Sequence, residues 1–310
     1  MRYDDFRRSD DIEDRRDDGG MGGGGGGMGL PIGGGGLGIG TIIVLGLIGY
    51  AFGIDPRVLI GGAEIVTGGG APSYQTDRRA GPAKTGAPKD EQGNMIAGIL
   101  GEIDDRWSEI FQANGQRWTG PKIVLFKNVT NGGRCGRAES AMGPFYCPPE
   151  REIFLDTGFF REVETRFHGC SGNACKFTTA YIIAHEAGHH VQNLLGILPR
   201  VTQRQQQEGR GTPQSNALQV KVELQADCLS GVWVNREAKK RPGFLEEGDI
   251  DSALSTASAI GDDTLQRQAT GRVVPDSFTH GSAAQRKRWF MTGYQQGTLQ
   301  ACNTFGADQL

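Results

Sequence analysis

One helical run with three fixed polar positions constrains this chain more than any other stretch. The run covers residues 178–195, and within it His185, Glu186 and His189 form an H-E-x-x-H motif. Residues four apart in a helix share a face, so the two imidazoles project together about one turn apart. That spacing suits two ligands of one zinc ion, and Glu186 can reach a water beside that ion. So short a motif also occurs by chance, so a third ligand has to support this interpretation.

A second helical pattern, over residues 216–240, offers the third ligand. Catalytic zinc ions usually take three protein ligands and keep one position for water. Glu223 and Asp227 again lie four residues apart, so Glu223 can bind the metal while Asp227 accepts the second N–H of a ligating histidine. The alternative is that both acids are ordinary surface carboxylates. Apolar neighbours such as Leu224 and Trp233 favour the ligand interpretation, because a buried unpaired acid is costly.

Taken together, these motifs closely resemble the bacterial neutral zinc metallopeptidases. The resemblance rests on His-Glu-Ala-Gly-His-His at 185–190, Glu-Leu-Gln-Ala-Asp-Cys at 223–228 and Thr-His-Gly-Ser-Ala-Ala-Gln-Arg at 279–286. It also takes in Gly-Pro-Phe-Tyr-Cys-Pro at 143–148 and the charged and glycine-rich N-terminal segments. The resemblance therefore covers most of the chain.

The resemblance implies a peptide-bond hydrolase of the thermolysin-like group, in which glutamate is the third ligand. It implies Zn²⁺ held by His185, His189 and Glu223, with Glu186 as the general base for a zinc-activated water. His280 resembles the cationic donor that such enzymes place beside the developing oxyanion, although a lone histidine is more often structural. The implied fold is a zincin-like catalytic domain of the α+β class, mainly α-helical, with a small sheet beside the motif helix.

Further elements follow from apolar periodicity and from turn residues. Helices are predicted over residues 96–111, 249–268 (interrupted at Gly261) and 282–300, and short strands over 123–126 and 153–155. The resemblance to thermolysin-like proteases, which hold the substrate backbone against a sheet edge beside the zinc helix, implies that a strand edge near Phe145 and Tyr146 holds an extended peptide. In the last helix, Arg286 and Arg288 have two interpretations, a solvated basic face or a role in the active site, for example with a substrate carboxylate. His190 points about 100° away from His189 and is expected either to pack or to support the ligands from behind.

Six cysteines form an even set, which favours disulfides. The favoured pairs are Cys135 with Cys147, Cys170 with Cys175, and Cys228 with Cys302. The rival interpretation is a cytosolic zinc knuckle formed by His168, Cys170 and Cys175. Disulfides are favoured because the N-terminal part of the chain points to an oxidising compartment.

Composition divides the chain into four segments. Residues 1–36 are Arg/Asp-rich and then Gly-rich, and are expected to be a disordered tail because they cannot bury enough apolar surface. Residues 37–54 carry no charge and are long enough for a transmembrane helix, the alternative being a signal peptide. Residues 55–90 are expected to be a flexible linker, and residues 91–310 the zinc metallopeptidase domain.

Charge distribution predicts a location and excludes one class of partner. Five arginines precede the apolar segment, so we expect a single-pass protein of the bacterial inner membrane, with a cytoplasmic N-terminus and a periplasmic or extracellular catalytic domain. The expected partners are the lipid bilayer, through that helix, and a peptide or protein substrate. A net charge of −3 without a basic stripe argues against nucleic acid.

Two other functions stay open at this point. One is a non-catalytic, membrane-tethered binding or assembly protein in which zinc is structural. The other is a zinc amidase acting on cell-wall peptides. A structural zinc site is usually closed by four protein ligands, so an open fourth position distinguishes an enzyme from the first alternative.

Overall fold

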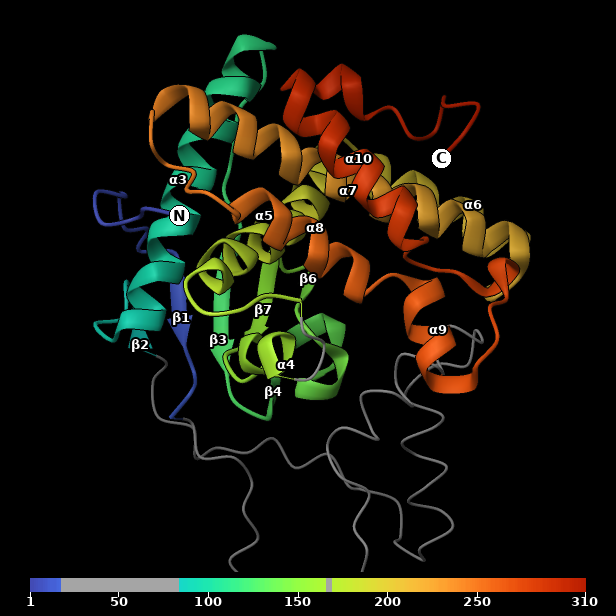
Figure 1. Cartoon of the computed structure of the whole chain (residues 1–310), viewed down its shortest axis with the longest axis horizontal. Helices are drawn as coiled ribbons and strands as arrows, with labels where there is room; N and C mark the ends of the chain where they lie inside the picture. Colours follow the sequence, from blue (N-terminus) through green and yellow to red (C-terminus); the bar gives the residue numbers. More distant parts are fainter. Residues whose placement is uncertain (18–83, 166–168) are drawn as a thin grey trace, which may run out of the picture.

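The computed structural model describes residues 1–17, 84–165 and 169–310, in which a layer of helices packs on a small sheet (Figure 1). Its helices are α3 (Glu91–Ala113), α4 (Phe159–Thr165), α5 (Ala174–Leu194), α6 (Ile197–Glu208), α7 (Pro213–Lys240), α8 (Asp249–Ala259), α9 (Asp262–Thr270) and α10 (Ala283–Gln296). Its strands are β1 (Ile12–Asp14), β2 (Lys84–Thr85), β3 (Lys122–Phe126), β4 (Val129–Asn131), β5 (Arg137–Glu139), β6 (Phe145–Cys147) and β7 (Glu152–Asp156). The prediction of a mainly helical α+β fold with a small sheet is confirmed.

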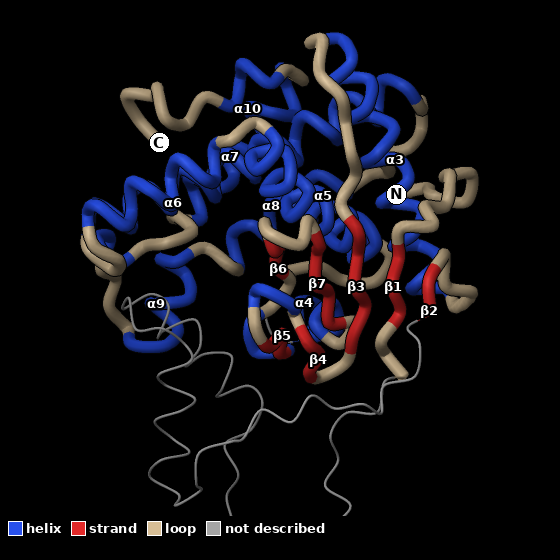
Figure 2. The backbone as a smooth tube through the Cα atoms, turned by 180° about the vertical axis from the view of Figure 1, so that it is seen from behind, coloured by secondary structure: helices blue, strands red, loops and turns tan. Residues whose placement is uncertain are grey.

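The main sheet has the strand order β2-β1-β3-β7-β6, visible side by side in Figure 2. Strands β1, β3 and β7 are parallel, and β2 and β6 run antiparallel at the two edges. Ile123 pairs with Ile153 and Leu125 with Leu155, so the two strands predicted from sequence are confirmed and are neighbours. Strands β4 and β5 form a separate two-stranded sheet.

Alternation along the central strands builds a core on each face of the sheet. Ile123 and Leu125 are fully buried in the large core, together with the helical side chains of Trp107 and Phe177. Val124, Phe126 and Phe154 point into a smaller core on the other face, with Ala138 and Cys147. The sheet thus separates the helical layer from the segment that contains β4 and β5.

Capping residues explain several helix ends. The Asp90 side chain accepts from the Gly93 amide and starts α3, and Ser282 and Gln285 form a reciprocal capping box at the start of α10. The helix predicted over residues 249–268 is two helices, α8 and α9, because the chain turns at Gly261. The helix predicted to reach residue 300 ends at Gln296, where Gly297 adopts the left-handed conformation that terminates helices.

The predicted disorder of the N-terminal tail is wrong for residues 1–17. Strand β1 lies inside the sheet, with Ile12 opposite Ile123 of β3, and Met1, Phe6 and Ile12 are buried. The charged residues have partners in the domain: Arg7, for example, donates its backbone N–H to the buried Glu102 and its guanidinium to the Gly101 carbonyl. The composition of residues 1–17 gave a wrong prediction because three buried apolar side chains and strand pairing are enough to hold a short segment on an existing core.

The N-terminal strand also bears on the predicted topology. A single crossing by residues 37–54 would put residues 1–17 and 84–310 on opposite sides of a bilayer, but β1 is hydrogen-bonded between β2 and β3. The expectation of a cytoplasmic N-terminus with an external catalytic domain is therefore incompatible with this sheet. Residues 37–54 lie outside the described residues, and of the helices that are described none combines the length and the apolar character needed to span a membrane.

The predicted linker is described only at its C-terminal end. There, residues 84–90 form the edge strand β2 and the cap of α3, which is more order than a flexible linker implies. Residues 18–36 and 55–83 lie outside the described residues.

All three predicted disulfides are present in the structure. Cys135 is bonded to Cys147, Cys170 to Cys175, and Cys228 to Cys302. The bond between Cys170 and Cys175 removes the thiols on which the zinc-knuckle alternative depended, and His168 lies outside the described residues. The bond between Cys228 and Cys302 ties the C-terminal segment to α7.

Candidate metal centre

Two helices bring the three predicted ligands together. His185 and His189 project from α5 and Glu223 from α7, and each residue offers a ligand atom within 4.8 Å of the others. The Nε2 atoms of His185 and His189 lie 3.2 Å and 3.4 Å from the same Glu223 oxygen, Oε2. His185 and Glu223 are buried, as is Glu186 beside them.

These separations match the edges of a tetrahedral zinc site. Two bonds of about 2.0–2.2 Å at a tetrahedral angle put their ligand atoms about 3.3–3.6 Å apart. Each of the two histidine nitrogens already lies at nearly that distance from the carboxylate oxygen. In the part of the chain that the structure describes, no fourth histidine, cysteine or acid belongs to the cluster, which leaves one position of a tetrahedron without a protein ligand.

The second ring nitrogens of both histidines are hydrogen-bonded, and this selects Nε2 as the metal ligand. His185 Nδ1 lies 2.9 Å from Asp227 Oδ1, as predicted for a carboxylate that accepts the second N–H of a ligating histidine. His189 Nδ1 lies 2.9 Å from Gln192 Oε1. Because both acceptors are oxygens, each imidazole carries its proton on Nδ1 and presents Nε2 to the cluster.

A close approach of α5 to α7 makes this geometry possible. Gly188 lies between the two motif histidines, and a Cβ added there would meet Ala226 backbone atoms at 3.0–3.1 Å. The absence of a side chain at Gly188 therefore lets α7 come near enough for Glu223 to reach the face of α5 that carries the histidines.

Buried charged groups shift the pKa values of the three residues in the cluster. Burial raises the pKa of Glu223, and the imidazoles of His189 and His185 more than reverse that effect, so the pKa lies well below its usual value. Burial lowers the pKa of His185, but Asp227 and Glu223 raise it, to about 10 overall. The pKa of His189 is raised as well, by Glu223 against burial. The acids thus create a site that favours positive charge, which a divalent cation supplies in exchange for protons.

Glu186 and His280 lie close to the ligands without belonging to them. Burial raises the pKa of Glu186, although nearby histidines, His280 among them, oppose the rise. His280 Nδ1 lies 3.4 Å from Asp262 Oδ1, and its side chain is 30% exposed. Burial lowers the pKa of His280 and Asp262 raises it, with a net rise. His280 is therefore a partly exposed imidazole near the cluster, and Asp262 favours its protonated form.

Sequence reasoning missed several residues that fix these positions. Gln192 holds His189, and Gln219 donates to the other Glu223 oxygen, Oε1, at 2.8 Å. Both could have been found by spacing, because they lie three residues after His189 and four before Glu223. Asp262 accepts hydrogen bonds from the backbone N–H groups of residues 279, 280 and 281 and so holds the loop of His280. These contacts join two separate segments of the chain, so local spacing could not predict them.

The basic residues of α10 have separate roles. Arg286 is buried and donates to Asp227, so it is part of the site and not of a solvated face. Arg288 is exposed and donates to the carbonyls of Gln309 and Leu310. His190 lies between Tyr146 OH and the Thr119 carbonyl, at 2.9 Å and 2.7 Å, which confirms that it packs.

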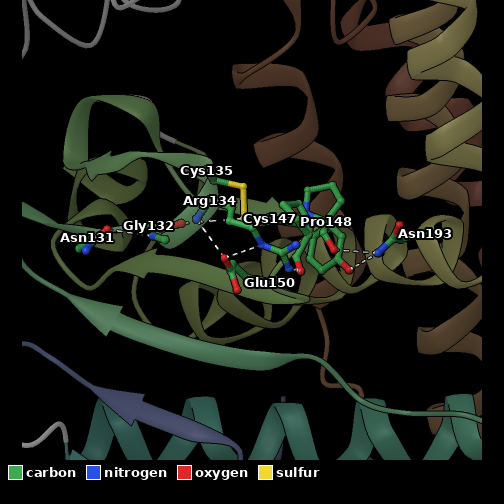
Figure 3. The surroundings of a disulfide bond; sticks show 11 residues. Asn131, Gly132, Arg134, Cys135, Cys147, Pro148, Glu150 and Asn193 are labelled. Carbon is green, nitrogen blue, oxygen red and sulfur yellow. Dashed lines mark hydrogen bonds and ion pairs between the residues drawn. A yellow bond between two sulfur atoms is a disulfide. The ribbon is translucent and has the colours of Figure 1, made fainter.

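Strand β6 connects the metal helix to a disulfide. Asn193, one turn beyond His189 on α5, donates to Tyr146 OH and to the Pro148 carbonyl at 2.9 Å and 3.1 Å. Figure 3 shows Asn193 pointing toward Pro148, next to the disulfide between Cys135 and Cys147. In the described sheet β6 is an edge strand, so its outer backbone groups face away from β7.

Comparison with known proteins gives one family. The family described as "Putative neutral zinc metallopeptidase" matches residues 1–305. The uncharacterized protein YpfJ of Escherichia coli (strain K12) is 42% identical over 306 residues, covering 99% of both chains. The uncharacterized protein Rv2575 of Mycobacterium tuberculosis (strain ATCC 25618 / H37Rv) is 44% identical over 216 residues, covering 67% of this chain and 69% of its own length.

No solved structure matches the chain. The family match includes the N-terminal segment that carries β1, the H-E-x-x-H helix and the helix that carries Glu223. With the His, His, Glu cluster in place, the chain belongs to the neutral zinc metallopeptidase family.

Proposed function

We propose that this protein is a zinc-dependent peptidase with Glu186 as its general base. The observation that carries the proposal is the convergence of His185, His189 and Glu223 on one point, with Glu186 next to the first ligand. Three protein ligands without a fourth are typical of catalytic zinc, whereas structural zinc is usually closed by four. This argues against the alternative of a binding protein with a structural ion.

Zinc held by these ligands supplies a Lewis acid that polarises a carbonyl oxygen and acidifies a water. Glu186 accepts the proton of the attacking water and passes it to the departing amine. Its burial supports this role, because a raised pKa brings the carboxylate closer to the pH at which it both takes and returns a proton. His280, held by Asp262, donates to the oxyanion that forms on the substrate.

An extended peptide lying along β6 fits the same site. The strand is at the edge of the sheet, beside α5, and its outer N–H and C=O groups suit strand addition. Beyond Pro148, a cavity of about 260 Å³ is lined by Asn193, Leu198 and other uncharged side chains of α6. We propose that it holds an uncharged substrate side chain, because its lining offers no charged side chain to pair with a charged one.

Three disulfides support a working location outside the reducing cytosol. The predicted contact of residues 37–54 with a bilayer stays a prediction, because those residues lie outside the described part of the chain.

The test is incubation of the zinc-loaded full chain with a peptide library, with and without chelator, read by mass spectrometry. Cleavage that stops with chelator is the expected result, with uncharged residues enriched at one position. Release of cell-wall cross-links without cleavage of linear peptides would favour the amidase alternative.

Glu186→Gln separates catalysis from metal binding. It should keep zinc affinity and lower the turnover rate by about 10²–10⁴-fold, the range expected for loss of a general base. The matched control is Glu247→Gln, at an exposed position remote in sequence from the motif, which should change neither quantity. Unchanged hydrolysis in Glu186→Gln would remove Glu186 from the proposed role.

A further inference from the structure

Three buried side chains donate hydrogen bonds to the two carboxylate oxygens of Asp227. Oδ1 accepts from Tyr181 OH at 2.6 Å and from His185 Nδ1 at 2.9 Å. Arg286 donates through Nε to Oδ2 at 2.8 Å and through Nη2 to Oδ1 at 3.0 Å. Asp227 is 0% exposed and Arg286 3%, so water does not compete for these contacts. A carboxylate held by this fork cannot rotate away from His185.

Arg286 reaches Asp227 because α10 packs very closely on α7. A Cβ added at Gly293 would lie 1.8 Å from the Cys228 carbonyl oxygen, so only glycine permits this contact. Arg286 Nη2 also lies 3.2 Å from Tyr181 OH, which in turn donates to Asp227. Arg286, Tyr181 and Asp227 therefore form a closed ring of hydrogen bonds directly behind His185.

Stability of the fold alone gives a weak reason for this arrangement. Replacing a buried ion pair by apolar residues of similar volume is often neutral or stabilising, because burial of two charges is expensive. The pair between Arg286 and Asp227 is fully buried, and among the described residues the titrating side chains hydrogen-bonded to it are Tyr181 and the ligand His185. The pair therefore controls the orientation of His185.

We propose that Arg286 is a positioning residue of the metal centre that acts through Asp227. It fixes the Asp227 carboxylate against His185 Nδ1, so that His185 presents Nε2 to the cation. The inference rests on the proposed function only in taking His185 as a metal ligand.

A double-mutant cycle on the full chain tests this inference. Zinc dissociation constants are measured by chelator competition for wild type, Arg286→Gln, Asp227→Asn and the double variant. Each single change should weaken zinc binding by about 10–100-fold, the range known for residues that hold metal ligands. Because both residues act through one contact, the zinc affinity of the double variant should be no lower than that of the single variant with the lower affinity.

A matched control and a spectroscopic readout exclude a merely structural role. Arg288→Gln makes the same substitution two residues along α10, at an exposed arginine, and should leave zinc affinity within about twofold of wild type. The visible bands of the Co²⁺-loaded protein should shift in Arg286→Gln and Asp227→Asn and not in Arg288→Gln. Losses that add in the double variant, or wild-type affinity in Arg286→Gln, would overturn the inference.

Arg286→Lys keeps the inference testable if Arg286→Gln does not fold. Lysine retains the charge but cannot form the fork, so its zinc affinity should lie between those of wild type and Asp227→Asn, and it should again not add to Asp227→Asn. Additive behaviour of the lysine variant would equally overturn the inference. Zinc affinity needs no substrate, so a wild-type protein that binds zinc but cleaves no peptide would refute the proposed function and leave the cycle interpretable.

Discussion

Polar and charged residues mark both the two helices of the candidate metal centre, α5 and α7, and the N-terminal segment of residues 1–17, yet only the two helices could be predicted from the sequence. In α5 and α7 the polar residues recur every four positions, and a helix turns this spacing into a shared face. In residues 1–17 the charges follow no such period, and Ile12 finds its partner at Ile123. Local spacing is visible in a sequence, whereas pairing across a hundred residues is not.

The largest expected effect concerns the helices. Glu223→Ala removes a ligand and should weaken zinc binding by more than about 100-fold, because loss of a ligand exceeds the effect of losing a residue that only holds one. The measurement is chelator competition with the full chain. The control is Glu208→Ala on α6, which lies on a different helix and forms an ion pair with Arg204. Wild-type zinc affinity in Glu223→Ala would show that Glu223 is not a ligand, contrary to the prediction from its spacing on α7.

The second-largest expected effect concerns strand β1, which the composition of residues 1–17 failed to predict. Ile12 is 1% exposed between β3 and the helical core, so Ile12→Ala should lower the free energy of unfolding by about 2–4 kcal/mol. Urea unfolding measures this change. Val274→Ala, at a site 47% exposed, is the control and should change stability by less than about 0.5 kcal/mol. If Ile12→Ala behaved like the control, residues 1–17 would be the dispensable tail that their composition indicates.

A smaller effect, dependent on pH, comes from Asp104 on α3, the helix on which residues 1–17 pack. Burial raises the pKa of Asp104 from 3.8 to about 7, although the Trp118 indole donates to it. Between those pH values the folded protein holds a proton that the unfolded chain has released, so this group's contribution to stability falls as pH rises. Asp104→Asn cannot ionise and avoids that loss.

The stability of Asp104→Asn relative to wild type should therefore grow from about pH 4 and level off above about pH 7. A gain of about 1–3 kcal/mol is expected, less than the full value for this shift because Asp104 is partly exposed. Urea unfolding at several pH values measures the difference. A difference that stays constant over this range would mean that Asp104 is not protonated in the folded protein.

The same contrast explains how much could be predicted. His185, Glu186, His189, Glu223 and Asp227 follow from spacing within two helices, and the disulfides of Cys135 and Cys170 from short separations along the chain. Arg286 lies 59 residues from Asp227 and 105 from Tyr181, so its role depends on how α10 packs on α7. Strand β1 was missed for the same reason.

The topology prediction failed for a related reason. It treated the arginines before the apolar segment as a signal for membrane orientation, whereas several of these arginines are bound to the domain, Arg7 to Gly101 and Arg16 to Asp90. A charge pattern read by itself cannot distinguish a cytoplasmic tail from a strand that belongs to the sheet.

A crystal structure of the zinc-loaded full chain, with the metal located by anomalous scattering, tests the central claim most directly. The account predicts a single zinc ion bonded to Nε2 of His185 and of His189 and to a Glu223 oxygen, each at about 2.0–2.2 Å. A zinc ion with Glu223 well beyond bonding distance, or one closed by a fourth protein ligand, would contradict it.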